Sequence, residues 1–192
     1  MSRLLLTLDF INEFNDPAGK APVCAEMVKK HGVIAKANQA IAWARKNGVL
    51  IAHVKVGFAK NYANCPLNSP LFGKAKELEL IELGGWGTEF VKELDVQPED
   101  SIIIKHRISA FYNTSLETYL RANKIETIIL CGVATNFAVE AAAREAHDRD
   151  YNVITLKDAC AGRTEEQHEQ AFAIALGALT KVMTVDELTQ LK

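Results

Sequence analysis

The chain alternates short apolar runs with amphipathic stretches. Six apolar runs predict strands, at residues 4–8, 49–55, 101–106, 126–132 and 151–159 and in a short run that begins near residue 181. Between the first two runs, Ile34, Ala37, Ile41 and Ala44 recur at spacings of three, four and three, which predicts one helix within residues 27–47. Further helices are predicted after residue 114, from residue 136 and after residue 164, the first and last of them with a capping pair, Thr114 with Glu117 and Thr164 with Gln167. A terminal helix follows the last strand.

This alternation predicts the fold class. Strands that are apolar on both faces and separated by helices form a mostly parallel sheet that is covered on both sides. We therefore expect a three-layer α/β/α fold with a doubly wound, mostly parallel, six-stranded sheet. No repeat or composition shift marks a boundary, so residues 1–192 are expected to form a single domain.

One segment does not fit the alternation. Residues 57–83 contain Gly57, Pro66, Pro70 and Gly73 and predict a long loop with at most one short helix. A loop of this length in a compact domain is usually functional. We expect it to cover an active site or to form an interface.

The residues that follow the strands are the candidates for chemistry, because ligands of such sheets bind beyond the carboxyl ends of the strands. Asp9 follows the first strand, Lys105 ends the third, and a corner at residues 132–138 follows the fourth. A carboxylate next to apolar residues must be paired, and Lys105 is the natural partner of Asp9. The pair could be a structural tie between strands or a proton-transfer pair with shifted pKa values.

Other strand-end signals are weaker. Asp158 could join the pair, although an Asp followed by Ala-Cys-Ala-Gly is more often a cap for the next turn. No dinucleotide fingerprint follows a strand, because GGWGTEF at 84–90 lacks that context, and no G-x-S-x-G elbow is present. We therefore expect no cofactor.

Composition narrows the function classes. The net charge of −2, without a basic block, argues against nucleic acid or an anionic membrane as a partner. No apolar run approaches the roughly 18 residues of a membrane span, and the N-terminal run predicts a strand and not a signal peptide.

The cysteines, at positions 24, 65, 131 and 160, lack zinc spacing, and Cys131 and Cys160 are expected to be buried free thiols. That usage predicts a reducing, cytoplasmic compartment, and the scattered histidines predict no metal site.

Five stretches of the chain, taken together and in order, resemble the isochorismatase-like hydrolase family, also called the cysteine hydrolases. They are LLLTLDFINEF at 4–14, GGWGTEF at 84–90, IIIKHRISAFYNTSLETYL at 102–120, IILCGVATNFAVEAAAREA at 128–146 and YNVITLKDACAG at 151–162. The resemblance implies an α/β fold with a six-stranded parallel sheet, a hydrolase acting on a small molecule, and a homo-oligomer. The loop at 57–83 and the apolar side of the helix at 137–149 are the expected interfaces.

The resemblance also implies roles for residues. Amidase members of the family use an Asp, a Lys and a Cys, which match Asp9, Lys105 and Ala138 of this chain. The corner before the Cys often holds a cis peptide, which here would join Val133 and Ala134. The corner residues Ala134 and Asn136 would bind substrate together with backbone N–H groups of 134–138. The family's metal cluster has only His53 as a counterpart, so the resemblance implies no metal.

Ala138 is the departure that decides the chemistry. A cysteine at a helix start can attack an amide carbon, and an alanine cannot. Cys131 would be held away from the site if it lies within the fourth strand. The isochorismatase branch of the family cleaves a vinyl ether without a cysteine, with an Asp as general acid. This mechanism would require a raised pKa of Asp9. Burial of the carboxyl group raises that pKa, and the positive charge of Lys105 lowers it.

The pocket walls are predicted to include aromatic side chains. The candidates are Phe14, Phe58, Trp86 and Phe111, with Trp86 and Phe111 favoured. Arg107 and Arg144 could bind a substrate carboxylate, but pairing on the surface or between helices is the simpler role. The stretch at 163–170 is most simply a solvated helix start.

Three functions are consistent with the sequence. The first is a hydrolase without a cysteine nucleophile, acting on a small, cyclic or carboxylated substrate with Asp9 as general acid or base and Lys105 as its partner. The second is an inactive homologue that binds a ligand. The third is an amidase or nicotinamidase type of enzyme whose cysteine at position 138 has been replaced.

Overall fold

A computed structural model of the chain describes residues 2–191. The strands are β1 (Arg3–Leu8), β2 (Leu50–Val56), β3 (Ser101–Lys105), β4 (Thr127–Val133), β5 (Asn152–Ala161) and β6 (Lys181–Met183). The α-helices are α1 (Asn12–Asn15), α2 (Ala25–His31), α3 (Val33–Lys46), α4 (Leu116–Ala122), α5 (Glu140–His147), α6 (Glu165–Ala171), α7 (Gly177–Leu179) and α8 (Val185–Thr189). A 3₁₀ turn, η1 (Trp86–Thr88), and two π-helical turns, η2 (Thr135–Val139) and η3 (Phe172–Leu176), complete the elements.

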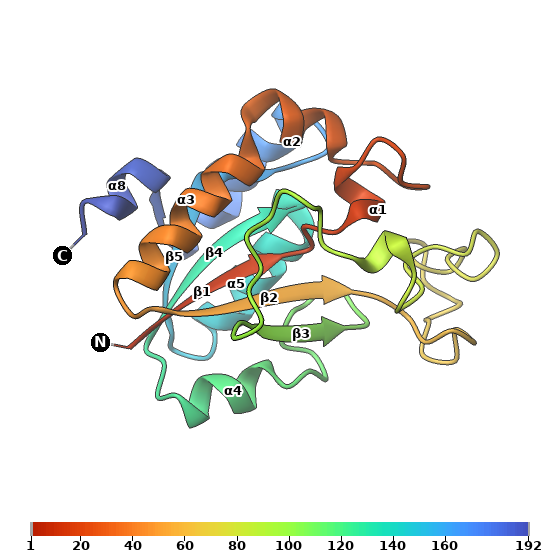
Figure 1. Cartoon of the computed structure of the whole chain (residues 1–192), viewed down its shortest axis with the longest axis horizontal. Helices are drawn as coiled ribbons and strands as arrows, with labels where there is room; N and C mark the ends of the chain where they lie inside the picture. The colour runs from red at the N-terminus through yellow and green to blue at the C-terminus, as the bar shows by residue number, and fades with distance from the viewer. Residues whose placement is uncertain (1, 192) are drawn as a thin grey trace.

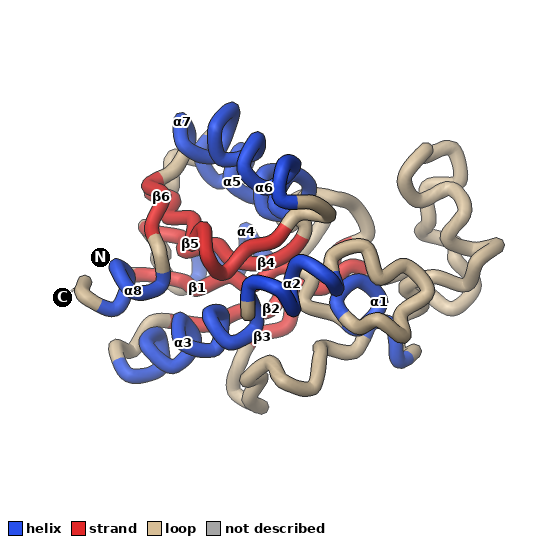
Figure 2. Tube along the Cα trace, turned by 90° about the horizontal axis from the view of Figure 1, so that it is seen from above, coloured by secondary structure: helices blue, strands red, loops and turns tan. Residues whose placement is uncertain are grey.

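The strands form one parallel sheet in the order β3-β2-β1-β4-β5-β6. Helices α2, α3 and α8 lie on one side of it and α5, α6 and α7 on the other (Figure 2). The predicted doubly wound, three-layer fold with six parallel strands is therefore confirmed. Because β1 has β2 on one side and β4 on the other, the strand order reverses at β1 (Figure 1), which is where such sheets bind ligands.

The predicted helices needed two local corrections, and one predicted cap is confirmed. The helix expected within 27–47 is two helices, because Gly32 adopts a left-handed conformation with φ of 62° that ends α2 and begins α3. The Thr114–Glu117 capping pair does not form: Ser115 is the N-cap of α4, and the Thr114 hydroxyl accepts from the Leu116 N–H at 3.2 Å and donates to the Ala110 carbonyl. Thr164 does cap α6 by accepting from the Gln167 N–H at 3.2 Å.

The long loop is present as predicted, without the one short helix that its sequence allowed. Residues 57–83 hold turns and no helix, and in Figure 1 they extend well beyond the carboxyl ends of β2 and β3. The loop has a small apolar cluster of its own, in which Phe58 packs edge-on against Phe72 at 5.5 Å between ring centroids. This cluster lets the loop keep a defined shape outside the main core.

A buried polar chain links β1, β2 and α3. The His53 ring contacts the Thr7 hydroxyl through Nδ1 at 2.8 Å and the Asp100 carboxylate through Nε2 at 3.1 Å. Arg45 donates to the same carboxylate at 2.7 Å. His53 is fully buried, and this burial lowers its pKa, an effect that the Asp100 carboxylate partly opposes.

This chain predicts that acidification destabilises the fold. The pKa of His53 is lower in the folded chain than the ordinary value of about 6.5 in the unfolded chain. The unfolded chain therefore binds the proton first, and the free energy of unfolding should fall as the pH drops from about 7.5 to about 5.5. Urea unfolding at both pH values measures the change. His53→Asn should reduce the difference between the two pH values, and His147→Asn, at an exposed position, should leave it unaltered; an unaltered difference in His53→Asn contradicts the prediction.

Candidate active site

Asp9 is held in a fixed position at the carboxyl end of β1. It adopts a left-handed backbone conformation with φ of 54°, which is unusual for a residue other than glycine and turns the chain out of the strand. Its N–H donates to the Val54 carbonyl at 2.9 Å, and its carbonyl accepts from the Asn15 side chain at 2.9 Å. These bonds fix the backbone, so the direction of the carboxylate is fixed as well.

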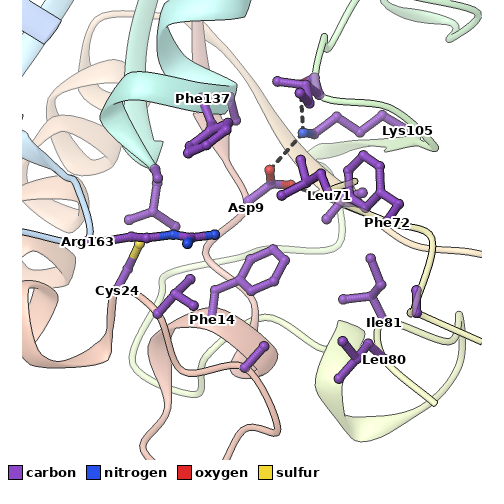
Figure 3. Close-up of a pocket in the computed structure, with 18 residues that line it drawn as sticks. Asp9, Phe14, Cys24, Leu71, Phe72, Leu80, Ile81, Lys105, Phe137 and Arg163 are labelled. Atoms are coloured by element: carbon purple, nitrogen blue, oxygen red, sulfur yellow. Dashed lines mark hydrogen bonds and ion pairs between the residues drawn. The ribbon is translucent and has the colours of Figure 1, made fainter. Parts of the chain in front are cut away.

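The Asp9 carboxylate binds two neighbouring strands at once. Oδ1 accepts from the Val56 N–H at 2.9 Å, and Oδ2 contacts Lys105 Nζ at 2.7 Å. Lys105 ends β3 and also donates to the Ile108 carbonyl at 2.9 Å (Figure 3). Both side chains are almost completely buried, so the expected Asp9–Lys105 pair exists as a buried ion pair across β1, β2 and β3.

Burial and pairing act on Asp9 in opposite directions. Removal from water raises the pKa of its carboxyl group, and this is the larger effect. Lys105 and the Val56 N–H lower it, and the net result is a pKa above the ordinary value. A carboxyl group that binds a proton more readily than usual is suited to general acid or base catalysis.

The corner after β4 forms the opposite side of the site. The peptide bond between Val133 and Ala134 is cis, as expected. Gly132 has φ of 140°, and a Cβ at this position would collide with the Leu8 backbone, so the close approach of β4 to β1 requires glycine. Ala134 and Ala138 line the site. The Phe137 N–H donates to the Ala134 carbonyl at 3.0 Å, so the set of free N–H donors expected at 134–138 does not include it.

These elements surround a cavity of about 150 Å³. Asp9 and Lys105 contribute the charged groups at its inner side, and the labelled side chains of Phe14, Leu71 and Phe72 face it (Figure 3). Leu71, Phe72, Ala75, Leu80 and Ile81 all come from the long loop. The loop therefore covers the site, as one of its two expected roles requires, and its use as an interface stays a prediction.

Only part of the predicted pocket wall lies at the cavity. Phe14 lines it, but Phe58, Trp86, Phe111 and Asn136 do not. Trp86 is about half exposed on η1, and Phe111 packs against Tyr151 beneath the guanidinium of Arg149. Phe58 lies in the loop's own cluster, and the carbonyl oxygen of the Asn136 side chain is buried without a hydrogen-bond partner. Position next to a strand end did not reveal which way these side chains point.

Three further predictions concern polar residues. Asp158 does not join the pair and does not cap the next turn, because it lies within β5 and accepts from the Val185 N–H at 2.8 Å, at the start of α8. Arg144 pairs with Glu140 on α5, and Arg107 donates to the Asn64 and His106 carbonyls. The apolar side of α5 packs into the core through Ala142, Ala143 and Ala146, so it is not a free interface.

A cationic residue and a thiol at the cavity were not predicted from the sequence. Arg163, expected to be a solvated helix start, extends its guanidinium across the cavity in Figure 3 and lies 5.6 Å from the Phe137 ring. Cys24, at the start of α2, faces it. The place of Arg163 directly after β5 was the available signal, since β5 extends to Ala161.

The cysteines are poor nucleophiles. All four are free and buried. Burial raises the pKa of Cys24 to about 12, although Arg163 opposes the shift. At neutral pH the thiol form therefore dominates, whereas the thiolate is the form that attacks carbon. Cys131 lies within β4 with a pKa well above the ordinary value and does not line the cavity.

Glu13 contacts three segments that lie outside the sheet, next to the cavity. Its buried carboxylate accepts from the Ala21 N–H at 2.9 Å and the Ile81 N–H at 3.5 Å. Gly87 lies against the same carboxylate, where a Cβ would come within 2.5 Å of its oxygen. One side chain thus joins the turn at 16–24, the end of the long loop and η1.

Among residues 2–191, no helix is long and apolar enough to cross a membrane. In the same range, no three His, Cys, Asp or Glu side chains are grouped so that they could hold a metal ion.

Known proteins resemble this chain in sequence and in structure. Residues 3–187 match the model of the isochorismatase domain. The chain is 33% identical over 156 residues to the isochorismatase family protein YecD of Escherichia coli O157:H7, covering 81% of each. It is 29% identical to the ureidoacrylate amidohydrolase RutB of Acinetobacter baylyi, covering 88% of this chain and 76% of that protein. The crystal structure of an isochorismatase-like hydrolase from Alkaliphilus metalliredigens superposes with a TM-score of 0.80 at 30% identity, covering 99% and 98% of the two chains.

The Glu13 contacts predict that its loss loosens the cavity. Glu13→Ala removes the acceptor of the buried Ile81 N–H and of the partly buried Ala21 N–H, which should lower the free energy of unfolding by about 1–3 kcal/mol. Hydrogen exchange should become faster in the peptides that contain Ala21 and Ile81, since both lose their acceptor.

Glu79 supplies the matched control. It belongs to the same loop but is exposed and pairs with Lys20 on the surface. Glu79→Ala should change stability by less than about 1 kcal/mol and leave exchange at Ala21 unaltered. Equal effects of the two substitutions would show that Glu13 does not hold the walls together.

Proposed function

Because the chain belongs to the isochorismatase family, whose members are hydrolases, we propose that it hydrolyses a small, cyclic or carboxylated substrate without a cysteine nucleophile. Asp9 acts as general acid or base, and Lys105 is its partner. The observation that carries this proposal is the buried 2.7 Å contact between Asp9 and Lys105 inside a cavity whose corner presents Ala138.

The chemistry follows from the groups at the cavity. Asp9 binds a proton more readily than an ordinary aspartate, so its protonated form can donate to a carbon or a leaving group of the substrate. Water then adds to the activated centre, and the carboxylate takes back a proton. Lys105 stabilises the carboxylate after proton transfer and fixes its orientation through a second bond to the Ile108 carbonyl.

Cysteine chemistry has little support from this arrangement. Ala138 occupies the position that matches the nucleophile of the family's amidases. Cys24 is the cysteine in the cavity, and its pKa of about 12 keeps it as a thiol. The name of RutB points to ureidoacrylate as a substrate type, and we expect the amide chemistry of such relatives to require a cysteine at position 138.

We also expect a homo-oligomer. Leu67, Leu71 and Leu78 of the long loop expose a large part of their surface, which supports the loop as the interface.

The proposal predicts that Asp9 is essential for turnover. Asp9→Asn should lower kcat/KM at least about 10³-fold on whichever member of a vinyl-ether, amide and carbamate panel, isochorismate included, the wild-type chain hydrolyses. Circular dichroism and thermal unfolding should show that the variant is folded. Asp148→Asn, at an exposed aspartate, is the control and should keep full activity.

Two results would contradict the proposal. One is an Asp9→Asn variant that stays active. The other is a wild-type chain that turns over no panel member, while Ala138→Cys gains amidase activity; that outcome would favour an inactive, ligand-binding homologue.

A further inference from the structure

The cavity contains one positive charge that no protein group neutralises. Two of its lining residues are cations, Lys105 and Arg163, and one is an anion, Asp9. Lys105 is bound to Asp9 at 2.7 Å, so these two charges balance. Arg163 makes no ion pair among residues 2–191, and the cavity is left with one net positive charge.

The acidic residues nearest to Arg163 in sequence are engaged elsewhere. Glu165 pairs with Lys30 at 3.0 Å and with His31 at 2.9 Å, on the side of α2. Glu166 accepts from the Gln170 side chain at 3.0 Å. Arg163 is an exposed residue that makes no ion pair with the described residues, so its guanidinium donors are available to water or to a group that enters the cavity.

Arg163 is also well positioned. It follows the end of β5 at Ala161 and precedes Thr164, the residue that caps α6. Its guanidinium lies 5.6 Å from the centroid of the Phe137 ring, a cation–π contact that limits its motion. In Figure 3 it points into the same space as the Asp9 carboxylate, from another side. A planar guanidinium placed in this way binds a carboxylate through two parallel hydrogen bonds.

The rest of the wall is apolar. Phe14, Leu71, Phe72, Leu80, Ile81 and Ile108 line the space between the charged groups. Such a wall offers no hydrogen-bond partners to a ureido or hydroxyl group, and burying one there without a partner costs free energy. It favours a ring or a branched hydrocarbon body.

We propose that Arg163 forms the carboxylate-binding part of the site and that the substrate is a monocarboxylate with an apolar body. The carboxylate binds Arg163, the body packs against the loop wall, and the bond to be hydrolysed reaches Asp9. Substrates with two carboxylates, or with a ureido group in place of the body, are disfavoured. This inference rests on the proposed function only in taking the cavity as the substrate site.

The test uses four small probes and calorimetric titration of the full chain. Benzoate has one carboxylate and an apolar ring, benzamide is its neutral counterpart, isophthalate has a second carboxylate, and 3-ureidopropionate has a polar body. Benzoate should bind at least about tenfold more tightly than each of the other three.

Variants locate the effect at Arg163. Arg163→Gln should weaken benzoate binding by about 10- to 100-fold, the loss expected for charge-assisted hydrogen bonds, and should leave benzamide binding unchanged. Arg163→Lys should restore part of the benzoate affinity, since it keeps the charge but not the paired donors. Arg144→Gln is the matched control, because Arg144 pairs with Glu140 outside the cavity, and it should bind benzoate as the wild type does.

Each contrary result overturns the inference. These are no benzoate binding up to about 10 mM, equal affinity for benzoate and benzamide, tighter binding of isophthalate or 3-ureidopropionate, and an Arg163→Gln variant that binds benzoate normally. Binding does not depend on turnover. Selective benzoate binding by a chain that hydrolyses nothing would refute the proposed function and keep this inference, whereas hydrolysis without Arg163-dependent binding would do the reverse.

Discussion

The buried ion pair of Asp9 and Lys105 is the interaction on which the site depends. One carboxylate binds the Val56 N–H with one oxygen and Lys105 with the other, so it connects the ends of β1, β2 and β3. Charges this deeply buried are tolerated only when each is paired and hydrogen-bonded. Removal of one partner leaves the other charge buried and unpaired, which strongly lowers the free energy of unfolding. The pair therefore fixes the geometry of the sheet edge and, at the same time, keeps a proton-binding group inside a cavity.

The other elements serve this pair. The cis corner after β4 brings Ala134 and Ala138 opposite to it, and the long loop places apolar side chains over it. Glu13 holds the loop and the turn at 16–24 together. Arg163 adds a second polar group on the far side of the cavity. The buried ion pair, a further cation and an apolar wall are thus supplied by segments that are distant in sequence.

Much of this arrangement was predictable from the sequence, for physical reasons. Apolar runs separated by amphipathic ones specify a parallel sheet, and the carboxyl ends of parallel strands lie at the same edge of the sheet. Asp9, Lys105 and the 132–138 corner could therefore be placed together at that edge. The corner's cis peptide followed from the family resemblance and is present.

Side-chain direction in irregular segments could not be predicted. Trp86 and Phe111 do not line the cavity, whereas Leu80 and Ile81 line it from a loop that has no periodic pattern. The position of Arg163 next to a strand end was not predicted, because β5 is longer than its apolar run suggests. It ends at Ala161 and not at residue 159. Gly32 divides a helix whose apolar spacing is uninterrupted.

The most direct test of the central claim is the pKa of Asp9 itself. Titration of the Asp9 carboxyl carbon by ¹³C NMR, with assignment from the Asp9→Asn variant, measures it in the intact chain. We expect a pKa above the ordinary 3.8, because burial outweighs the attraction of Lys105. A carboxyl group that titrates at or below 3.8 would show that the pair is a structural tie and that Asp9 is not suited to transfer a proton.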